Sequence, residues 1–385
     1  MICRKDALQD LEFTNKYIRK VHPIFRDSIP DEYETEYKMA RATIESCDSI
    51  SINQLFINIQ SFVATLHDAH THLFTKYKEL HHFKYGNYGT IIAINGKSAD
   101  SIVHDKLHLL SYETFEHAIV QFSTSISTYE NIMLFEFDID NGIDYTFAQP
   151  TGDTITISIT RDSFSSIAEE ESNINSQSSI SNYWINDSIN VAYFNISSFV
   201  CYIPEYRDSF RNELSSFFNE VNQHDISNII IDLRENTGGN NAPWHDMLEY
   251  LSNDILNYGT HIMRRGPFTF KYSREFKSTN KITDIYSGNI YTLTSPKTFS
   301  SAMEFADCLQ GNSLAKIVGE SPGNTPNCYT NITQFCLPKS CLHLSVSTEQ
   351  SIETRPGIID NRIVPDYKCN SSEALNKVLE IINQQ

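Results

Sequence analysis

The chain has 385 residues, enough for two or three domains of ordinary size. Apolar residues make up 40% of it and charged residues 20%, which excludes a disordered protein, and no apolar run approaches the ~20 residues that cross a bilayer. The chain has 30 Lys and Arg residues and 48 Asp and Glu residues, so its net charge is −18. Because an acidic protein repels phosphate groups, a nucleic acid is not an expected partner.

The cysteines and the N-terminal residues are the features that relate to the cellular compartment of the protein. No CxxC pair occurs among the eight cysteines, so a zinc ribbon is not expected. Cys328, Cys336 and Cys341 lie close together, which leaves open a disulfide in an exported protein or free thiols otherwise. Residues 1–5 (MICRK) lack an apolar leader, so the sequence leaves two alternatives: a cytoplasmic protein, or an exported one whose leader has been removed.

The first 75 residues or so read as helices. Apolar residues at helical spacing precede Pro23, and a second amphipathic segment follows Asp31. A third segment starts at residues 51–54 (SINQ), which have the pattern of a capping box, and ends at the histidine-rich residues 67–72 (HDAHTH).

From about residue 86 to residue 160 the apolar period shortens to that of strands. Residues 90–96 predict a strand that enters a turn, and residues 155–159 predict a strand with period two. Residues 164–181 are rich in Ser, Glu and Asn and predict an exposed linker.

After the linker, strand and helix patterns alternate. Strands are predicted at residues 191–194, 229–233, 290–293, 317–318 and 342–346. Helices are predicted at residues 210–221, 243–251, 300–309 and 375–382. This alternation indicates an α/β layer with parallel strands.

Two segments of this layer hold residues suited to acyl transfer. Residues 232–239 (DLRENTGG) read as a buried strand that runs into a Gly-Gly turn. Such a turn brings backbone N–H groups close to a ligand and can supply an oxyanion hole, although an ordinary tight turn has the same pattern. Residues 295–304 (SPKTFSSAME) follow a strand and open a helix, where a serine either caps the helix or acts as a nucleophile near its positive end.

His67, His70 and His72 offer three readings. They could hold a metal, one could serve a nucleophile as base, or they are ordinary solvated or core histidines. No HExxH pattern or nearby carboxylate triad supports the metal, so none is expected.

Taken in order, these motifs resemble the tail-specific, or C-terminal-processing, serine protease family, which includes the core of tricorn protease and shares its fold with the interphotoreceptor retinoid-binding proteins. Residues 232–239 match the family's DLRxNxGG, and residues 298–304 match TxSAxE with one extra residue after the threonine. Residues 316–323 resemble KxVGExTxG, residues 68–71 resemble the DxHT of members that use histidine, and Pro365-Asp366 fits the terminal PD.

The resemblance implies roles for individual residues. Ser301 would be the nucleophile, and the oxyanion hole would comprise the N–H of Ala302 and one from Gly238 or Gly239. Members with a Ser–Lys dyad carry the lysine just after GExT, where this chain has residues 323–326 (GNTP). His70 therefore takes the role of base, as in tricorn-like relatives.

The third catalytic member is less defined by the motifs. Tricorn-like relatives place an acidic residue and an asparagine shortly before PD, and Asp360-Asn361 fits with a one-residue gap. Asp366 and Glu353 are alternatives. Ala69 stands where the tricorn-type chain has a serine, so a bridging hydroxyl is not expected there.

The resemblance also implies a fold. We expect an α/β domain of the ClpP/crotonase type over residues 181–385, preceded by a helical region over residues 1–78 that contributes His70. Residues 79–180 are expected to form a small β-rich, PDZ-like insert and a linker, although no carboxylate-binding loop is identifiable.

The expected function is a serine peptidase that works through an acyl-enzyme intermediate, without metal or organic cofactor. Its expected partners are peptide or protein substrates, with a homo-oligomer left open. The alternative is a non-catalytic protein on the same fold that binds a hydrophobic ligand or a peptide, because fold does not fix function.

Overall fold

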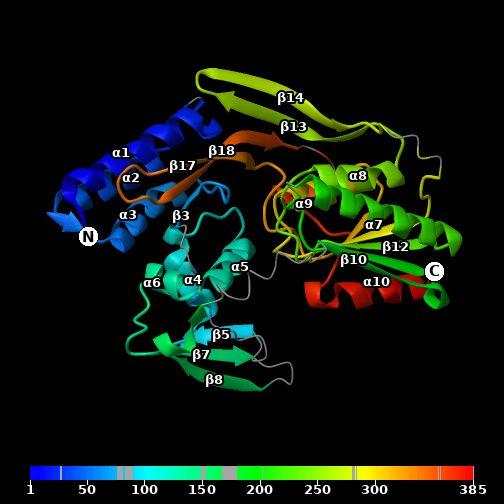
Figure 1. Ribbon diagram of the computed structural model, residues 1–385, viewed down its shortest axis with the longest axis horizontal. Helices are drawn as coiled ribbons and strands as arrows, with labels where there is room; N and C mark the ends of the chain where they lie inside the picture. The colour runs from blue at the N-terminus through cyan, green and yellow to red at the C-terminus, as the bar shows by residue number, and fades with distance from the viewer. Residues whose placement is uncertain are drawn as a thin grey trace. The chain divides into compact units, whose positions relative to one another are not determined.

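The structure is a computed structural model that describes residues 1–26, 28–75, 81–82, 90–148, 153–166, 180–201, 203–279, 282, 284–353, 355 and 357–384. Its contacts divide the chain into two compact units (Figure 1). The first unit comprises Met1–Gln177, Met263–Thr269 and Tyr329–Glu349, and the second comprises Ser178–Ile262, Phe270–Cys328 and Gln350–Gln385.

The three predicted N-terminal helices are confirmed as α1 (Arg4–Val21), α2 (Asp31–Glu45) and α3 (Ile52–Ala64). The Ser51 side chain caps α3 by accepting a hydrogen bond from the Gln54 backbone N–H at 3.1 Å. The helices enclose a buried core whose largest members include Leu11, Tyr33 and Phe62.

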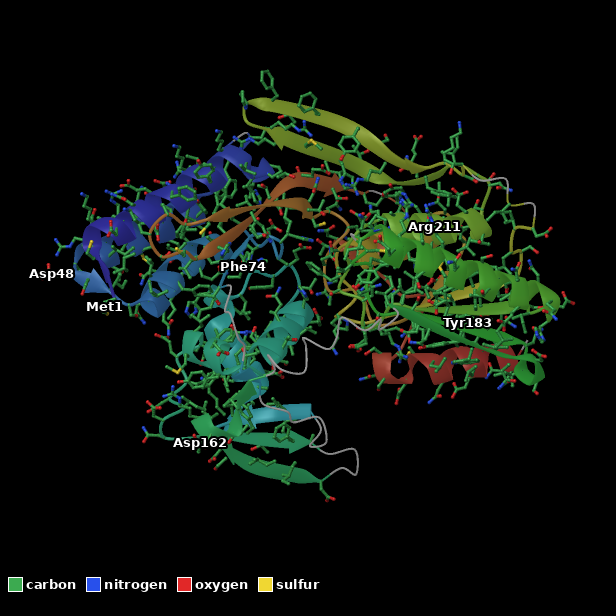
Figure 2. The ribbon with its side chains drawn as sticks, in the orientation of Figure 1. Met1, Asp48, Phe74, Asp162, Tyr183 and Arg211 are labelled. Carbon is green, nitrogen blue, oxygen red and sulfur yellow. The ribbon has the colours of Figure 1, made fainter. Side chains whose placement is uncertain are left out.

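A segment from far along the sequence completes this core. Strand β3 (His72–Phe74) pairs antiparallel with β18 (His343–Ile352), and the Phe74 ring stacks on His343 with centroids 5.3 Å apart (Figure 2). Four buried residues near β18 pack among those of the N-terminal helices: Leu337, Leu342, Leu344 and Val346. The sheet has the order β14-β13-β18-β17 with β3 beside β18, and its other strands are β13 (Leu256–Arg265), β14 (Phe268–Phe276) and β17 (Tyr329–Cys336).

The rest of the first unit has a core of its own. A four-stranded sheet in the order β6-β5-β7-β8 combines β5 (Thr90–Ile94), β6 (Lys97–Ser98), β7 (Ile143–Ala148) and β8 (Thr154–Ile159). Its helices are α4 (Ala99–Lys106), α5 (Phe115–Ser125) and α6 (Tyr129–Leu134). Both predicted strands are therefore confirmed, while most of the predicted linker, residues 167–179, lies outside the described residues.

Three short pairs of strands complete the description of both units. They are β1 (Ile2–Cys3) with β2 (Ser49–Ile50), β4 (His81–His82) with β9 (Ser165–Ser166), and β19 (Ile358–Ile359) with β20 (Arg362–Ile363).

The second unit is built on a six-stranded sheet in the order β10-β11-β12-β15-β16-β21. The strands are β10 (Ser181–Asn186), β11 (Val191–Ile196), β12 (Asn228–Asp232), β15 (Asn289–Thr294), β16 (Lys316–Gly319) and β21 (Tyr367–Lys368). Only β10 is antiparallel to its neighbour, so the predicted parallel α/β layer is confirmed.

Alternate residues of β12 bury the two faces of this sheet. Ile229 and Ile231 pack against α7 (Pro204–Gln223), α8 (Ala242–Leu251) and α9 (Ser301–Gly311), whereas Ile230 packs on the side of α10 (Ala374–Asn383). Figure 1 shows α7 and α10 on opposite sides of this sheet. Tyr183 of β10 packs edge to face on Phe217 of α7 (Figure 2). A helix covers each face, as binary patterning of the strands requires.

All eight cysteines are free thiols, and Cys336 and Cys341 are exposed while Cys328 is buried. Within the described part of the chain, no helix is both long enough and apolar enough to span a membrane.

Candidate active site

The candidate site in the second unit lies where two parallel strands end. Because β12 and β15 are parallel neighbours, their carboxyl ends lie at the same edge of the sheet, and the loops that follow them meet. The Leu233 N–H donates to the Leu293 carbonyl at 3.0 Å, and the Thr298 hydroxyl donates to the Leu233 carbonyl at 2.8 Å. The register of the sheet thus brings the DLRENTGG and TFSSAME motifs together.

The Gly-Gly turn touches the start of α9. Gly238 and Gly239 have φ of +98° and +136°, values that favour glycine. A Cβ added at Gly238 would lie 2.8 Å from the Phe299 carbonyl oxygen, and one at Gly239 would lie 2.3 Å from the Phe199 carbonyl carbon. Both glycines are therefore required by close backbone approach.

Ser301 is the first residue of α9, and the residue before it has an unusual backbone. Ser300, at the N-cap position, has φ of +54° and ψ of −125°, and its side chain makes no capping hydrogen bond. Its N–H instead donates to the Asn324 Oδ1 at 2.9 Å. Strained backbone of this kind occurs at sites that present a reactive side chain.

The Ser301 hydroxyl is held in a buried hydrogen-bonded arrangement. Its Oγ donates to the Asn241 Oδ1 at 2.6 Å and accepts from the Trp244 indole N–H at 2.9 Å, and the residue is only 3% exposed. The Asn241 amide in turn donates to Glu304 at 3.0 Å, and Arg274 donates to the same carboxylate at 3.1 Å. The hydroxyl proton is thus directed at an amide oxygen.

We expect Trp244→Phe to destabilise the wild-type chain more than it destabilises a Ser301→Ala chain. The Trp244–Ser301 hydrogen bond exists only when both partners are present, whereas the loss of ring volume is the same in either background. The difference between the two changes in the free energy of unfolding should be about 0.5–1.5 kcal/mol. A urea-unfolding double-mutant cycle measures it, and strict additivity would show that the hydrogen bond contributes nothing.

The backbone N–H groups predicted for the oxyanion hole differ in whether they already donate a hydrogen bond within the protein. The Gly238 N–H donates to the Asn236 Oδ1 at 2.9 Å, and the Ala302 N–H donates to the Phe299 carbonyl at 3.1 Å. Among the described residues the Gly239 N–H donates to no acceptor. Gly239 is therefore the more available of the two glycine donors.

Asp360 lies in the same unit, in the two-residue turn that joins β19 to β20. It is exposed with φ of +49°, and Asn361 follows with φ of +56°. Two successive residues of this conformation are typical of a type I′ hairpin, for which Asn and Asp are preferred. The Asn361 amide also binds Asn327, with its Nδ2 donating to the Asn327 carbonyl at 3.0 Å. These contacts give Asn361 a structural role in the turn.

The two alternatives to Asp360 also have local partners. The Asp366 carboxylate accepts from the Ile317 N–H at 2.9 Å and from Gln310 at 3.0 Å, which hold its pKa below its usual value against the effect of burial. The Glu353 N–H donates to the Asn327 Oδ1 at 2.8 Å.

His70 belongs to the first unit and is placed by a turn after α3. His67 has φ of +48° and directs the chain into residues 68–71, where the Asp68 Oδ1 accepts the His70 N–H at 2.9 Å. The Thr71 N–H donates to the Asp68 carbonyl at 3.1 Å, which closes the turn. The His70 side chain is 11% exposed, and its Nδ1 lies 3.8 Å from the Asp68 Oδ1.

Asp68 is a fully buried carboxylate with several partners. Its Oδ2 accepts from the His22 Nε2 at 3.0 Å and from the Thr71 hydroxyl at 2.5 Å. Burial alone would raise the pKa of Asp68, but its interactions with His22, His70 and Thr71 lower it to about 2. The residue is therefore charged throughout the physiological range.

The structure brings together Asp68, His70 and Glu113 closely enough for one cation, with their nearest ligand atoms within 4.8 Å of one another. Both oxygens of Asp68 already accept hydrogen bonds from protein groups, so we interpret this cluster as a carboxylate–histidine arrangement. The three histidines considered from the sequence do not form such a group among the described residues. The His72 Nδ1 instead donates to the Ala69 carbonyl at 3.2 Å.

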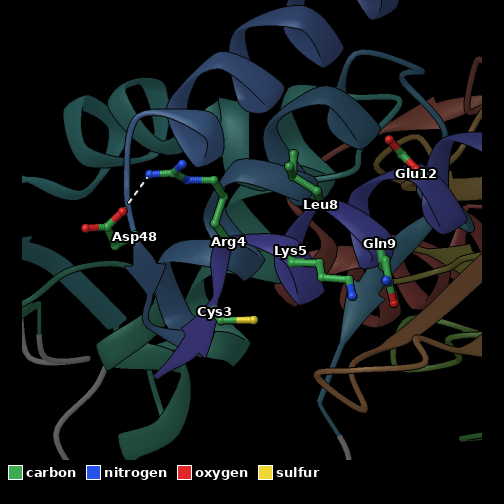
Figure 3. Close-up of a pocket in the computed structure, with 7 residues that line it drawn as sticks. All are labelled: Cys3, Arg4, Lys5, Leu8, Gln9, Glu12 and Asp48. Atoms are coloured by element: carbon green, nitrogen blue, oxygen red, sulfur yellow. Dashed lines mark hydrogen bonds and ion pairs between the residues drawn. The ribbon is translucent and has the colours of Figure 1, made fainter.

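A hollow of about 580 Å³ lies elsewhere in the first unit (Figure 3). It is lined by Cys3, Arg4, Lys5, Leu8, Gln9, Glu12 and Asp48. Arg4 and Asp48 pair across 2.7 Å there. None of the candidate catalytic residues belongs to it.

Several residues that contact Ser301 or Asp68 were not predicted from the sequence. Asn241, Trp244 and His22 carry no motif, and their roles depend on contacts 46 to 60 positions apart along the chain. Asp68 is part of the DxHT pattern, but the pattern assigns it no role.

Comparisons with known proteins bear on the fold and on the family that the second half of the chain resembles. Residues 190–369 match the family model of peptidase family S41, and no curated protein sequence matches the chain. The crystal structure of mature CPAF is similar with a TM-score of 0.71 and 12% identity, covering 99% of this chain and 98% of that one. The photosystem II D1 C-terminal processing protease gives a TM-score of 0.53 and 12% identity, covering 98% and 97%.

A third similar structure is a putative peptidase from Parabacteroides merdae, with a TM-score of 0.54 and 12% identity, covering 99% of this chain and 97% of that one. At these identities the structures establish the mixed α/β fold with its N-terminal helical region. The match over residues 190–369, a little under half of the chain, shows that this part of the protein is similar to peptidase family S41, a family of serine-type peptidases.

Proposed function

We propose that the protein hydrolyses peptide bonds through an acyl-enzyme intermediate, with Ser301 as nucleophile and His70 as base. The observation that carries this proposal is the Gly-Gly turn packed against the start of α9, whose first residue is Ser301. The match of residues 190–369 to the family model of peptidase family S41 supports it.

In the proposed reaction, the Ser301 hydroxyl leaves Asn241 and transfers its proton to His70 as Oγ attacks the substrate carbonyl carbon. The oxyanion that forms lies near the N-terminus of α9, whose partial positive charge favours it, and accepts hydrogen bonds from the oxyanion-hole N–H groups. His70 then donates the proton to the leaving amine, and water hydrolyses the ester with His70 again as base.

The oxyanion hole is proposed to combine the Ala302 N–H with one glycine N–H. Gly239 is favoured over Gly238, because the Gly238 N–H donates to the Asn236 side chain. Asp360 stays the third member that the sequence resemblance proposes, although its exposed turn gives that role no support.

We also propose a finer description of the fold. The parallel sheet with helices on both faces supports a crotonase-like layer in the catalytic domain, residues 181–385. The separate core of the four-stranded sheet supports a PDZ-like insert within residues 79–180, distinct from the helical region of residues 1–78.

The proposal is tested by incubating the protein with a mixture of unmodified peptides and identifying products by mass spectrometry. We expect new peptide ends in the wild type and none in Ser301→Ala. Absence of turnover, combined with quenching of intrinsic fluorescence by hydrophobic ligands, would favour the non-catalytic binding protein instead. Light scattering of the same sample tests whether the chain forms a homo-oligomer.

A further inference from the structure

We propose that Asp68 is the charged partner that positions His70 and stabilises its protonated form. This inference rests on the proposed function, in which His70 is the base. It assigns to a residue two positions before the histidine the role that the sequence resemblance gives to Asp360.

The first support is geometric. The Asp68 carboxylate faces His70 twice, since Oδ1 accepts the His70 backbone N–H at 2.9 Å and lies 3.8 Å from the ring Nδ1. A carboxylate on that side favours a proton on Nδ1, which leaves Nε2 as the atom that accepts a proton from a nucleophile. The backbone hydrogen bond holds the histidine in the turn, and the 3.8 Å separation, longer than a hydrogen bond, lets the carboxylate act on the ring through its charge.

The second support is the state of His22. Its Nδ1 accepts the Ile24 backbone N–H at 3.2 Å, so the ring proton must lie on Nε2, which donates to the Asp68 Oδ2 at 3.0 Å. A ring with this single proton is neutral. His22 therefore holds Asp68 in place without neutralising it, and the buried carboxylate keeps its full negative charge beside His70.

A third anchor comes from the strand that completes the N-terminal core. The Thr71 hydroxyl donates to the Asp68 Oδ2 and accepts the Ser347 N–H at 2.9 Å. Asp68, His22 and Thr71 are all completely buried. Hydrogen bonds from His22, Thr71 and the His70 backbone hold the Asp68 carboxylate in one orientation beside His70. A residue that positions another must itself be held in this way.

The other titratable groups near His70 and Asp68 come from several elements. They are His72 on β3, Glu113 before α5, His117 on α5 and Tyr329 on β17. Burial lowers the pKa of His72, and it lowers the pKa of His117 to about 4, so His117 is neutral near pH 7. Glu113 is the other carboxylate within reach and must be tested beside Asp68.

The direction of the pH effect follows from the charge. His70 must be neutral to accept the Ser301 proton, so activity rises as pH increases through the pKa of His70. A negative Asp68 raises that pKa and stabilises the imidazolium formed during attack. Asp68→Asn removes the charge at nearly constant volume, so it should move the acidic limb of the profile to lower pH and also lower the plateau.

The first experiment uses NMR of the histidine side chains in a Ser301→Ala background, where no activity is needed. We expect His70 to carry its proton on Nδ1 when neutral and His22 to carry its proton on Nε2. Asp68→Asn should lower the pKa of His70, Asp360→Asn should leave it unchanged, and Glu113→Gln, which removes another carboxylate near the ring, should lower it less than Asp68→Asn does. A neutral His70 protonated on Nε2, or a pKa that responds to Asp360→Asn or Glu113→Gln but not to Asp68→Asn, would overturn the proposal.

The second experiment measures the rate of fluorophosphonate labelling at Ser301 against pH. We expect Asp68→Asn to lower the rate about tenfold or more, with partial rescue in Asp68→Glu and a smaller loss of rate in Asp360→Asn. Should Asp68→Asn fail to fold, the tautomer of His70 in Ser301→Ala still decides the question. Failure of the wild type to label would count against the proposed function alone, because the NMR result does not depend on it.

Discussion

Replacing Ser301 with alanine is expected to lower peptide hydrolysis on the order of 10⁶-fold, as removal of the nucleophile does in hydrolases whose serine and histidine act as a unit. The side chain is nearly buried and accepts one hydrogen bond while donating another, so the substitution removes the reacting atom and both contacts. Hydrolysis is measured with a fluorogenic peptide selected from the products of the peptide mixture.

The matched variants are His70→Ala and the double variant. Since base and nucleophile act in one step, the double variant should lose no more activity than Ser301→Ala alone. Additive losses would mean that the two residues act separately, and an unchanged rate in Ser301→Ala would remove Ser301 from the mechanism.

Replacing Gly239 with alanine is expected to destabilise the protein by more than about 3 kcal/mol, because backbone overlap and a positive φ act together there. The new Cβ would lie 2.3 Å from the Phe199 carbonyl carbon and 2.4 Å from its oxygen, and neither belongs to a flexible side chain. The strand-like contact between residues 199 and 239 would separate, and the turn that faces Ser301 would move with it.

Gly266→Ala is the control for this prediction. Gly266 also has a positive φ, +60°, but an added Cβ there meets no atom within 4 Å. Its substitution should cost about 1 kcal/mol, the penalty of the left-handed backbone alone. Urea unfolding compares the two variants, and equal losses of stability would show that close approach at Gly239 is not what requires a glycine.

The regular elements were predictable where local patterns decide them. The helical spacing before Pro23, the cap at Ser51 and the apolar strand of residues 229–233 all have the predicted form. The long hairpin of β13 and β14 was not predicted. Aromatic and polar residues do alternate along β14, but the strand is exposed over most of its length, so the alternation does not mark a face buried in the core. Nor could periodicity reveal that residues 329–349 pack with helices formed by the first 64 residues, since that is a long-range contact.

The candidate site was predictable to the extent that its chemistry lies in short motifs. The glycines and Ser301 follow from two loops that adjacent parallel strands must bring together. The proposed role of Asp68 was harder to predict, because Asp and Asn occur in sequences for two different reasons. At residues 360–361 they suit a tight turn, whereas at residue 68 the carboxylate is buried between two histidines, a setting visible only after folding.

The most direct test of the account is to label the wild type, Ser301→Ala and His70→Ala with a fluorophosphonate probe and to map the adduct by mass spectrometry. The account predicts one adduct on Ser301 in the wild type, none in Ser301→Ala and a strongly reduced amount in His70→Ala. An adduct on another residue, or equal labelling of Ser301 in His70→Ala, would contradict a serine nucleophile activated by His70.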